Sequence, residues 1–286
     1  MGAAALAQRP SSAFNETLSR RNFSRLASYI YDYSGIKMPE NKKTMLEGRL
    51  RRRLRATGID TLDAYCESLF DGGLMVDEAL HLINAVTTNK TDFFREPAHF
   101  DYLRATILPD LEQRGIRSIR CWSAACSTGP EPYTVAMVLD DFVSTNEMTY
   151  GILATDLDTD VLETARRGIY PADLVEPVPA SLQRKYVMVP RDANRADVRM
   201  SPDLRSAIGF ARLNLMNDHY PVGDAMHLIF CRNVLIYFDK ALQKKVVSQL
   251  IDCLEPGGHM FLGHSESIAG FDLPLQQVAN TVFRRS

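Results

Sequence analysis

The sequence predicts an α/β fold, in which helices cover both faces of a mostly parallel sheet, preceded by an all-helical region. Short apolar segments alternate with helical patterns after residue 117, and no β-pattern appears before it. The 286 residues are 45% hydrophobic and 24% charged, which is enough apolar material for a packed core. This length suits one large domain, or one large and one small domain.

In the first third, apolar residues recur at three- and four-residue spacing, as they do along one face of a helix. The first stripe begins at Phe23 and is ended by Gly35, and the second runs from Leu46 to Leu54 and is ended by Gly58. Two further helices are predicted after Thr61 and over residues 76–86. This region is therefore expected to be a small helical domain.

The remaining two thirds alternate between strands and helices. We predict strands at 118–122, 149–154, 224–230 and 259–263, and helices at 131–142, 159–167 and 240–254. Three short β-like runs interrupt this alternation and are expected to form a small antiparallel insert: 186–189, 198–200 and 208–213.

Composition excludes several classes of protein. No run of about 18 apolar residues is present, so no membrane insertion is expected. The Ala-rich start lacks the core of a secretion signal, and residues 1–18 are read as a loose tail. The five cysteines are odd in number without a Cys-x-x-Cys pair, and the histidines show no tight ligand spacing. We therefore expect no metal site, free thiols and a cytoplasmic protein, and we assign His264 to a structural loop.

Charge is distributed unevenly along the chain. The net charge is -2, but residues 1–55 carry 12 lysines and arginines against 4 aspartates and glutamates. The five basic residues clustered on the second helix are Arg49, Arg51, Arg52, Arg53 and Arg55. Such an imbalance indicates a docking surface for an acidic partner, although charge runs are usually just solvated faces. Nucleic acid is not expected, since the segment has no interleaved aromatic residues.

A loop of small residues, 123–129, follows the first predicted strand and leads into a helix. Small residues let a backbone approach a ligand, and open α/β sheets bind ligands at the carboxyl ends of their strands. The loop lacks the glycine pattern of dinucleotide sites and the Gly-Lys-Ser/Thr of phosphate-binding loops. Two interpretations therefore remain: a ligand-binding loop or a tight strand-to-helix turn.

Acidic residues beside this loop favour the first interpretation. Asp156 ends the second strand, where an acid commonly accepts hydrogen bonds from ribose hydroxyls, and Asp158 is expected to cap the next helix. Glu131 lies in the first turn of the preceding helix, where it either interacts with the helix dipole or binds a cationic ligand. A carboxylate there would repel a pyrophosphate. S-adenosylmethionine, which carries an ammonium, a sulfonium and no phosphate, therefore fits better than NAD.

Six segments, in order, resemble the chemotaxis receptor methyltransferase family, CheR, over nearly the whole chain after about Ser19. They are 89–96 (NKTDFFRE), 122–133 (WSAACSTGPEPY), 154–158 (ATDLD), 214–215 (NL), 230–239 (FCRNVLIYFD) and 263–266 (GHSE). The resemblance implies a helical N-terminal domain (19–85), a linker that contributes to the cofactor site (86–96), and a Rossmann-like methyltransferase domain (97–286). It also implies an antiparallel β-subdomain inserted near 180–213. Family members that grip a receptor peptide often carry a glycine in the loop matching 190–196, and its absence here argues against tethering.

The resemblance also implies the site residues. The cofactor would be bound by Asn89, Thr91, Arg95, Ala125, Glu131, Asp156, Asn214, Leu215, Arg232 and Asn233. Arg95 and Tyr237 would lie near the transferred methyl group as catalytic residues. For each, the residues alone leave a structural alternative: a salt bridge to Glu96 or another surface acid for Arg95, and a core aromatic for Tyr237.

The implied activity is protein-glutamate O-methylation, in which a glutamate carboxylate oxygen of a methyl-accepting chemotaxis receptor attacks the sulfonium methyl group. Glutamate has a pKa of about 4.3 and is ionised at neutral pH, so no general base is needed. The arginine helix would contact the cytoplasmic helical region of the receptor, and the enzyme is expected to be a monomer. The alternatives are an NAD-dependent oxidoreductase, which would bind dinucleotide, a non-catalytic cofactor-sensing module, and a nucleic-acid methyltransferase.

Overall fold

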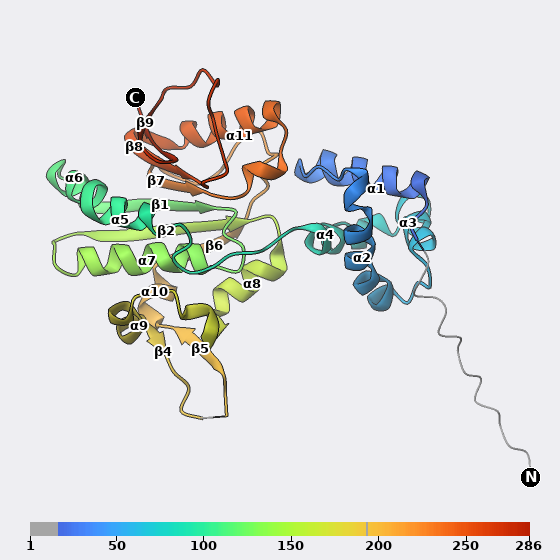
Figure 1. The fold of residues 1–286 in the computed structure, drawn as a ribbon, viewed down its shortest axis with the longest axis horizontal. Coiled ribbons are helices and arrows are strands. Elements are labelled where there is room, and N and C mark those ends of the chain that lie inside the picture. Colours follow the sequence, from blue (N-terminus) through green and yellow to red (C-terminus); the bar gives the residue numbers. More distant parts are fainter. Residues whose placement is uncertain (1–16, 193) are drawn as a thin grey trace, which may run out of the picture. The chain divides into compact units, whose positions relative to one another are not determined.

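The computed structural model describes residues 17–192 and 194–286, and the chain divides into two compact units between Thr87 and Thr88 (Figure 1). Most of the predicted tail, residues 1–18, lies outside the described residues. Leu18, the last residue of this predicted tail, belongs to the folded unit instead. It is buried, and its backbone N–H donates to Glu47 Oε1 at 2.8 Å. No helix in the described ranges is both long and apolar enough to cross a membrane.

The N-terminal unit is helical, as predicted. Its elements are α1 (Arg20–Ser34), η2 (Glu40–Lys42), α2 (Lys43–Thr57), α3 (Leu62–Phe70) and α4 (Met75–Val86). The apolar stripes of the sequence form one core, in which Leu26, Ile30 and Leu50 are fully buried. Gly35 and Gly58 end α1 and α2 in the left-handed region, where glycine has no steric penalty.

Two of the five arginines assigned to docking are bound within this unit. Arg53 makes a bidentate pair with buried Glu78, with Nε–Oε1 at 2.6 Å and Nη2–Oε2 at 3.0 Å. Arg49 donates to the backbone carbonyls of Val86 and Thr87 at the end of α4. The other three arginines of the cluster, Arg51, Arg52 and Arg55, form no ion pair with any residue the structure describes, and the last two are exposed.

The second unit is built on a seven-stranded sheet with the strand order β6-β2-β1-β7-β8-β10-β9. Its strands are β1 (Ser118–Ala124), β2 (Thr149–Asp156), β6 (Ile208–Arg212), β7 (Met226–Cys231), β8 (Leu254–Leu262), β9 (Leu275–Ala279) and β10 (Val282–Arg285). The first five pair in parallel, and β10 runs antiparallel to both β8 and β9. The predicted α/β fold is confirmed, although β9 and β10 were not predicted.

Helices connect and cover these strands. They are α5 (Ala98–Tyr102), the π-helical turn η3 (Leu103–Ile107), α6 (Leu108–Gln113), α7 (Pro130–Val143), α8 (Thr159–Arg167), α9 (Ala180–Tyr186), α10 (Pro202–Ser206) and α11 (Lys240–Asp252), with short 3₁₀ turns η4 (Ala172–Val175) and η5 (Leu235–Tyr237). Helix α7 packs against β2, α8 against β2 and β6, and α11 against β8. The predicted helices 131–142, 159–167 and 240–254 correspond to α7, α8 and α11.

A separate three-stranded antiparallel sheet has the order β3-β5-β4, from β3 (Ile169–Pro171), β4 (Val187–Met188) and β5 (Asp197–Met200) (Figure 1). The predicted insert is present, but one of its strands was wrong. Residues 208–213 do not belong to it, because Ile208–Arg212 pairs in parallel with β2 and extends the main sheet. Its place is taken by β3, which is too short and too close to a proline to show a strand pattern.

The topology brings three strand ends to one place. Strand β1 lies between β2 and β7, and all three run in the same direction. Ala124 is in register with Thr155, and Ser123 with Phe230. The loops that leave these strands, which begin at Ala125, Leu157 and Arg232, therefore lie side by side at the carboxyl edge, where open α/β sheets bind ligands.

Candidate active site

The loop after β1 is held in an unusual backbone conformation. Ala125 and Ser127 have φ angles of 61° and 53°, and Gly129 has 99°. A side chain at Gly129 would place its Cβ 2.7 Å from the Tyr170 hydroxyl, so only glycine fits there. Left-handed backbone at residues other than glycine costs free energy and concentrates at functional sites. This conformation favours the ligand-binding interpretation of the loop over a simple tight turn.

Asp156 fixes this loop from the end of β2. Its carboxylate accepts the backbone N–H groups of Ser127 at 2.8 Å and Asp158 at 2.9 Å. Burial raises the pKa of Asp156 to about 6, against the opposing effect of these hydrogen bonds. A buried carboxylate beside a strained loop has lone pairs left to accept further hydrogen bonds from a ligand.

Asp158 caps helix α8, as predicted, because its Oδ1 accepts the N–H groups of Asp160 at 2.9 Å and Val161 at 3.3 Å. Its other oxygen, Oδ2, accepts from Asn89 Nδ2 at 2.8 Å. The carbonyl of Asn89 in turn accepts from Ser127 Oγ at 2.9 Å. The segment that begins at Thr88 is thereby fastened across the loops that follow β1 and β2.

Glu131 and Arg232 form an ion pair at the same carboxyl edge of the sheet. The part of this edge that carries Asp156, Glu131 and Arg232 is called the crevice below. Arg232 Nη1 lies 3.2 Å from Glu131 Oε2, and Ser123 Oγ donates to Glu131 Oε1 at 2.7 Å. Burial raises the pKa of Glu131, and the positive charge of Arg232 only partly offsets this effect. The negative charge of the Glu131 carboxylate is therefore only partly neutralised by its protein partners, and a further cationic group could bind to it.

The Arg232 guanidinium also forms hydrogen bonds to the linker segment. Arg232 Nη2 donates to Glu96 Oε2 at 3.0 Å and to the backbone carbonyl of Arg95, and only 2% of its side chain is exposed. Burial raises the pKa of Glu96, but a backbone N–H of His264 and the charge of Arg232 outweigh it and the net pKa is lowered. Glu96 therefore stays ionised and holds the end of the linker in place. From the sequence, Glu96 was expected only as a partner for Arg95.

Glu266, also missed from the sequence, shapes the loop after β7. Its Oε2 accepts the N–H groups of Asn233 at 2.9 Å and Gly263 at 2.6 Å, and its Oε1 accepts that of Leu235 at 2.7 Å. Asn233 has a φ of 60°, and its Nδ2 donates to Glu96 Oε1 at 3.3 Å. The GHSE segment was the available signal, because it carried Glu266 three residues after the glycine that Asn233 approaches.

The remaining predicted site residues lie around this network. Arg95 forms no ion pair within the described ranges, and its Nη1 donates to the carbonyl of Lys90 at 3.2 Å. The salt bridge to Glu96 considered from the sequence is thus absent, because Glu96 pairs with Arg232. Asn214 Oδ1 accepts the N–H of Met216 at 3.0 Å, and the carbonyl of buried Leu215 accepts the Tyr220 hydroxyl at 2.7 Å. Two others, Thr91 in the linker and Tyr237 in η5, are half-buried.

A parallel sheet with small-residue loops in left-handed backbone, and with the carboxylates of Asp156 and Glu131 at its carboxyl edge, suits S-adenosylmethionine, and the family models place the chain among the methyltransferases that bind it. Residues 89–284 match the family model described as "CheR methyltransferase, SAM binding domain". Residues 21–87 match the one described as "CheR methyltransferase, all-alpha domain". The chain belongs to the CheR methyltransferase family, and the cofactor predicted from the sequence is the one this family binds.

Its curated relatives carry corresponding names. The chain is 38% identical over 270 residues to the chemotaxis protein methyltransferase of Escherichia coli, covering 94% of this chain and 92% of the relative. It is 36% identical over 262 residues to that of Borreliella burgdorferi, covering 90% and 91%. It is 34% identical over 268 residues to chemotaxis protein methyltransferase 2 of Pseudomonas aeruginosa, covering 93% of each.

Replacing Glu266 by glutamine is expected to destabilise the loop after β7. An amide would place N–H groups against the backbone N–H donors that the carboxylate now accepts, which should lower the free energy of unfolding by about 2–4 kcal/mol. Urea unfolding followed by fluorescence of Trp122, the single tryptophan, measures the change. Glu112→Gln, on the exposed side of α6, is the matched control and should change stability by less than about 0.5 kcal/mol. Equal stabilities of the two variants would contradict the role of Glu266.

Proposed function

We propose that the protein transfers the methyl group of S-adenosylmethionine to glutamate side chains of methyl-accepting chemotaxis receptors, forming glutamate methyl esters. Membership of the CheR family and the names of its relatives support this activity. The observation on which the site assignment depends is the buried Arg232, which pairs with Glu131 in the crevice and with Glu96 in the linker. Through its bonds to Glu96 and to the Arg95 carbonyl, it would hold the segment that carries Arg95 at the proposed cofactor site.

The residues present fit this cofactor. Asp156 would accept hydrogen bonds from the ribose hydroxyls, and the only partly neutralised Glu131 carboxylate would attract a positively charged group of the ligand. The bound cofactor supplies an electrophilic methyl group on its sulfonium. The proposed binding residues are Asn89, Thr91, Arg95, Ala125, Glu131, Asp156, Asn214, Leu215, Arg232 and Asn233.

The protein's task is then to position an acceptor that is already reactive. A glutamate carboxylate is ionised at neutral pH, so catalysis depends on orientation and on exclusion of water. Arg95 forms no ion pair in the described part of the chain, and its forked guanidinium is suited to orient a carboxylate. Tyr237 would donate a hydrogen bond or shape the channel for the methyl group.

Arg95→Ala is expected to lower kcat for receptor methylation by about 100-fold, because misorientation of the acceptor is costly. The assay combines labelled cofactor with receptor-containing membranes, followed by mild base. A carboxyl methyl ester releases labelled methanol, whereas an amine or amide product does not. Arg104→Ala removes an exposed arginine of the same unit and should leave the rate unchanged. Normal turnover by Arg95→Ala would exclude Arg95 from catalysis, and base-stable label on the receptor would exclude the ester.

Cofactor affinity should depend on pH through Asp156. A carboxyl group whose pKa is raised to about 6 is ionised only above that pH. Affinity for S-adenosylhomocysteine should therefore be constant above about pH 7 and fall by up to about tenfold per unit below pH 6. Calorimetric titrations between pH 5 and 8 test this expectation.

The matched variants for this titration are Asp156→Asn and Asp272→Asn, the second at an exposed position. Asp156→Asn should weaken binding at pH 7.5 and remove the step near pH 6, whereas Asp272→Asn should retain the wild-type profile. Persistence of the step in Asp156→Asn would assign it to another group.

We propose that Arg51, Arg52 and Arg55 dock the acidic, glutamate-bearing receptor helices, since Arg49 and Arg53 are bound within their own unit. Arg52→Glu with Arg55→Glu should raise KM for receptor membranes by about tenfold and leave affinity for S-adenosylhomocysteine unchanged, because charge complementarity promotes association. The control is Arg104→Glu with Arg117→Glu, an equal charge change at exposed positions of the other unit. An equal effect in both double variants, or none in the first, would contradict docking by this helix.

A further inference from the structure

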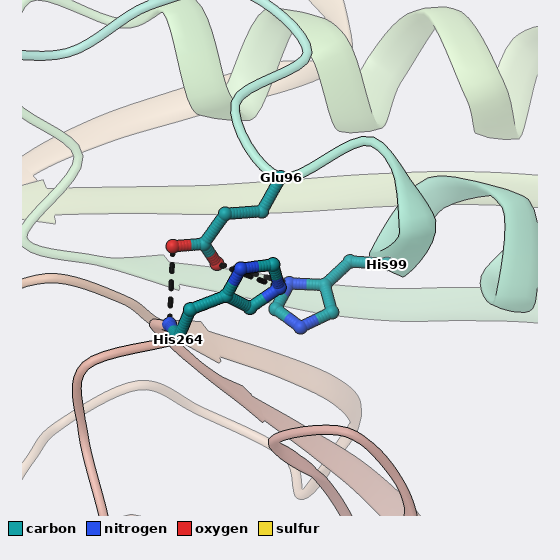
Figure 2. A group of neighbouring side chains, drawn as sticks. All are labelled: Glu96, His99 and His264. Carbon is teal, nitrogen blue, oxygen red and sulfur yellow. Dashed lines mark hydrogen bonds and ion pairs between the residues drawn. The ribbon is translucent and has the colours of Figure 1, made fainter.

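Three potential ligand atoms converge beside the Arg232 network, at Glu96, His99 and His264 (Figure 2). Glu96 Oε2 lies 3.5 Å from His99 Nδ1 and 3.9 Å from His264 Nε2, and all three atoms lie within 4.8 Å of one another. The residues come from the end of the linker, from α5 and from the loop after β8. Histidine spacing predicted no metal site, because residue 264 is distant in sequence from the other two.

The proton on His99 can be assigned from its neighbours. Its Nε2 lies 3.2 Å from the carbonyl oxygen of Asn280 and 2.9 Å from Thr281 Oγ1. The carbonyl only accepts and the Thr281 hydroxyl can also accept, so the tautomer with the proton on Nε2 satisfies both contacts and leaves a lone pair on Nδ1.

His99 Nδ1 is buried and has no hydrogen-bond partner within the described ranges. It faces the ionised Glu96 carboxylate, so the lone pair of His99 Nδ1 and the negatively charged Glu96 Oε2 lie only 3.5 Å apart. Such an arrangement is unfavourable unless a positively charged species lies between them. A metal ion between them would bind the imidazole lone pair and the carboxylate oxygen together.

We propose that Glu96 Oε2, His99 Nδ1 and His264 Nε2 bind a divalent transition-metal ion of the Zn²⁺ class, with a fourth position open to water. Two imidazoles and a carboxylate form a donor set that suits such ions. Bonds of about 2.0–2.1 Å in a tetrahedral site separate ligand atoms by about 3.3 Å, and rotation of the half-exposed His264 ring would close the remaining gap.

The surroundings of the site are consistent with this role. His99 donates its other ring N–H to a backbone carbonyl, which is the usual support of a metal-bound imidazole. Glu96 Oε1 is fixed by the backbone N–H of His264 at 3.0 Å and by Asn233 Nδ2. The nearby positive charge that would repel a bound cation is that of Arg232, whose Nη2 donates to Glu96 Oε2. That oxygen keeps a second lone pair for the ion, and Glu131 remains as a partner for Arg232.

Metal binding can be measured without methylation activity, on the untagged, metal-stripped full chain. Co²⁺ should bind at one ion per chain and give the visible d–d absorption of a four-coordinate ion. Zn²⁺ should displace it and raise Tm, because a ligand that binds only the folded state stabilises it. His264→Ala should weaken binding by at least about 100-fold, since even supporting partners of a ligand are worth 10–100-fold. His219→Ala, at another exposed histidine, should bind as the wild type does.

His264→Cys supplies a second and more specific readout. A thiolate remains a ligand, so this variant should retain Co²⁺ and acquire a cobalt–thiolate charge-transfer band that the wild type lacks. The proposal is overturned if the wild type binds no stoichiometric ion or if His264→Ala binds as tightly as the wild type. It is also overturned if the wild type shows the thiolate band, which would place the ion on a native cysteine.

Discussion

The arrangement of the crevice depends on one buried positive charge, the guanidinium of Arg232. Burying an unpaired charge costs several kcal/mol, so this group must find carboxylates. It pairs with Glu131 at the start of α7 and with Glu96 at the end of the linker, while the following residue, Asn233, is fixed by Glu266. The position of the linker is therefore set by an electrostatic requirement of the strand-end loop, and the same pairing aligns the backbone that presents Arg95.

Strained backbone and charged hydrogen bonds occur together around this crevice. Of the six residues other than glycine with positive φ in the described ranges, five lie here: Phe94, Glu96, Ala125, Ser127 and Asn233. Each such conformation costs about 1–3 kcal/mol. The N–H groups of Ser127 and Asn233 each donate to a buried carboxylate, Asp156 and Glu266, and such charge-assisted bonds offset the strain. These hydrogen bonds hold the loops through the protein's own residues, and a site held in this way has a lower entropic cost of binding.

Local patterns made much of this molecule predictable. Helix α8, with its Asp158 cap, follows from periodicity and capping chemistry, and so do the ends of α1 and α2 at glycine. Strand pairing and ion pairs between residues that are distant in sequence could not be predicted. Ile208–Arg212 looks like any short strand until its pairing with β2 is known, and Arg53 looks like its exposed neighbour Arg52 until Glu78 lies beside it. Glu96, His99 and His264 meet only because the fold brings residues 96 and 264 together.

Glu96 joins two electrostatic environments through one oxygen, because Oε2 accepts from Arg232 and also faces the two imidazoles. A cation bound at the histidines would share the charge of this carboxylate with Arg232. Arg232 would then be drawn more strongly to Glu131, and the potential in the crevice would become more positive. A cationic cofactor would be bound less tightly, whereas an anionic acceptor near Arg95 would be held more tightly. By linkage, the factor by which the ion changes the affinity for a ligand equals the factor by which that ligand changes the affinity for the ion.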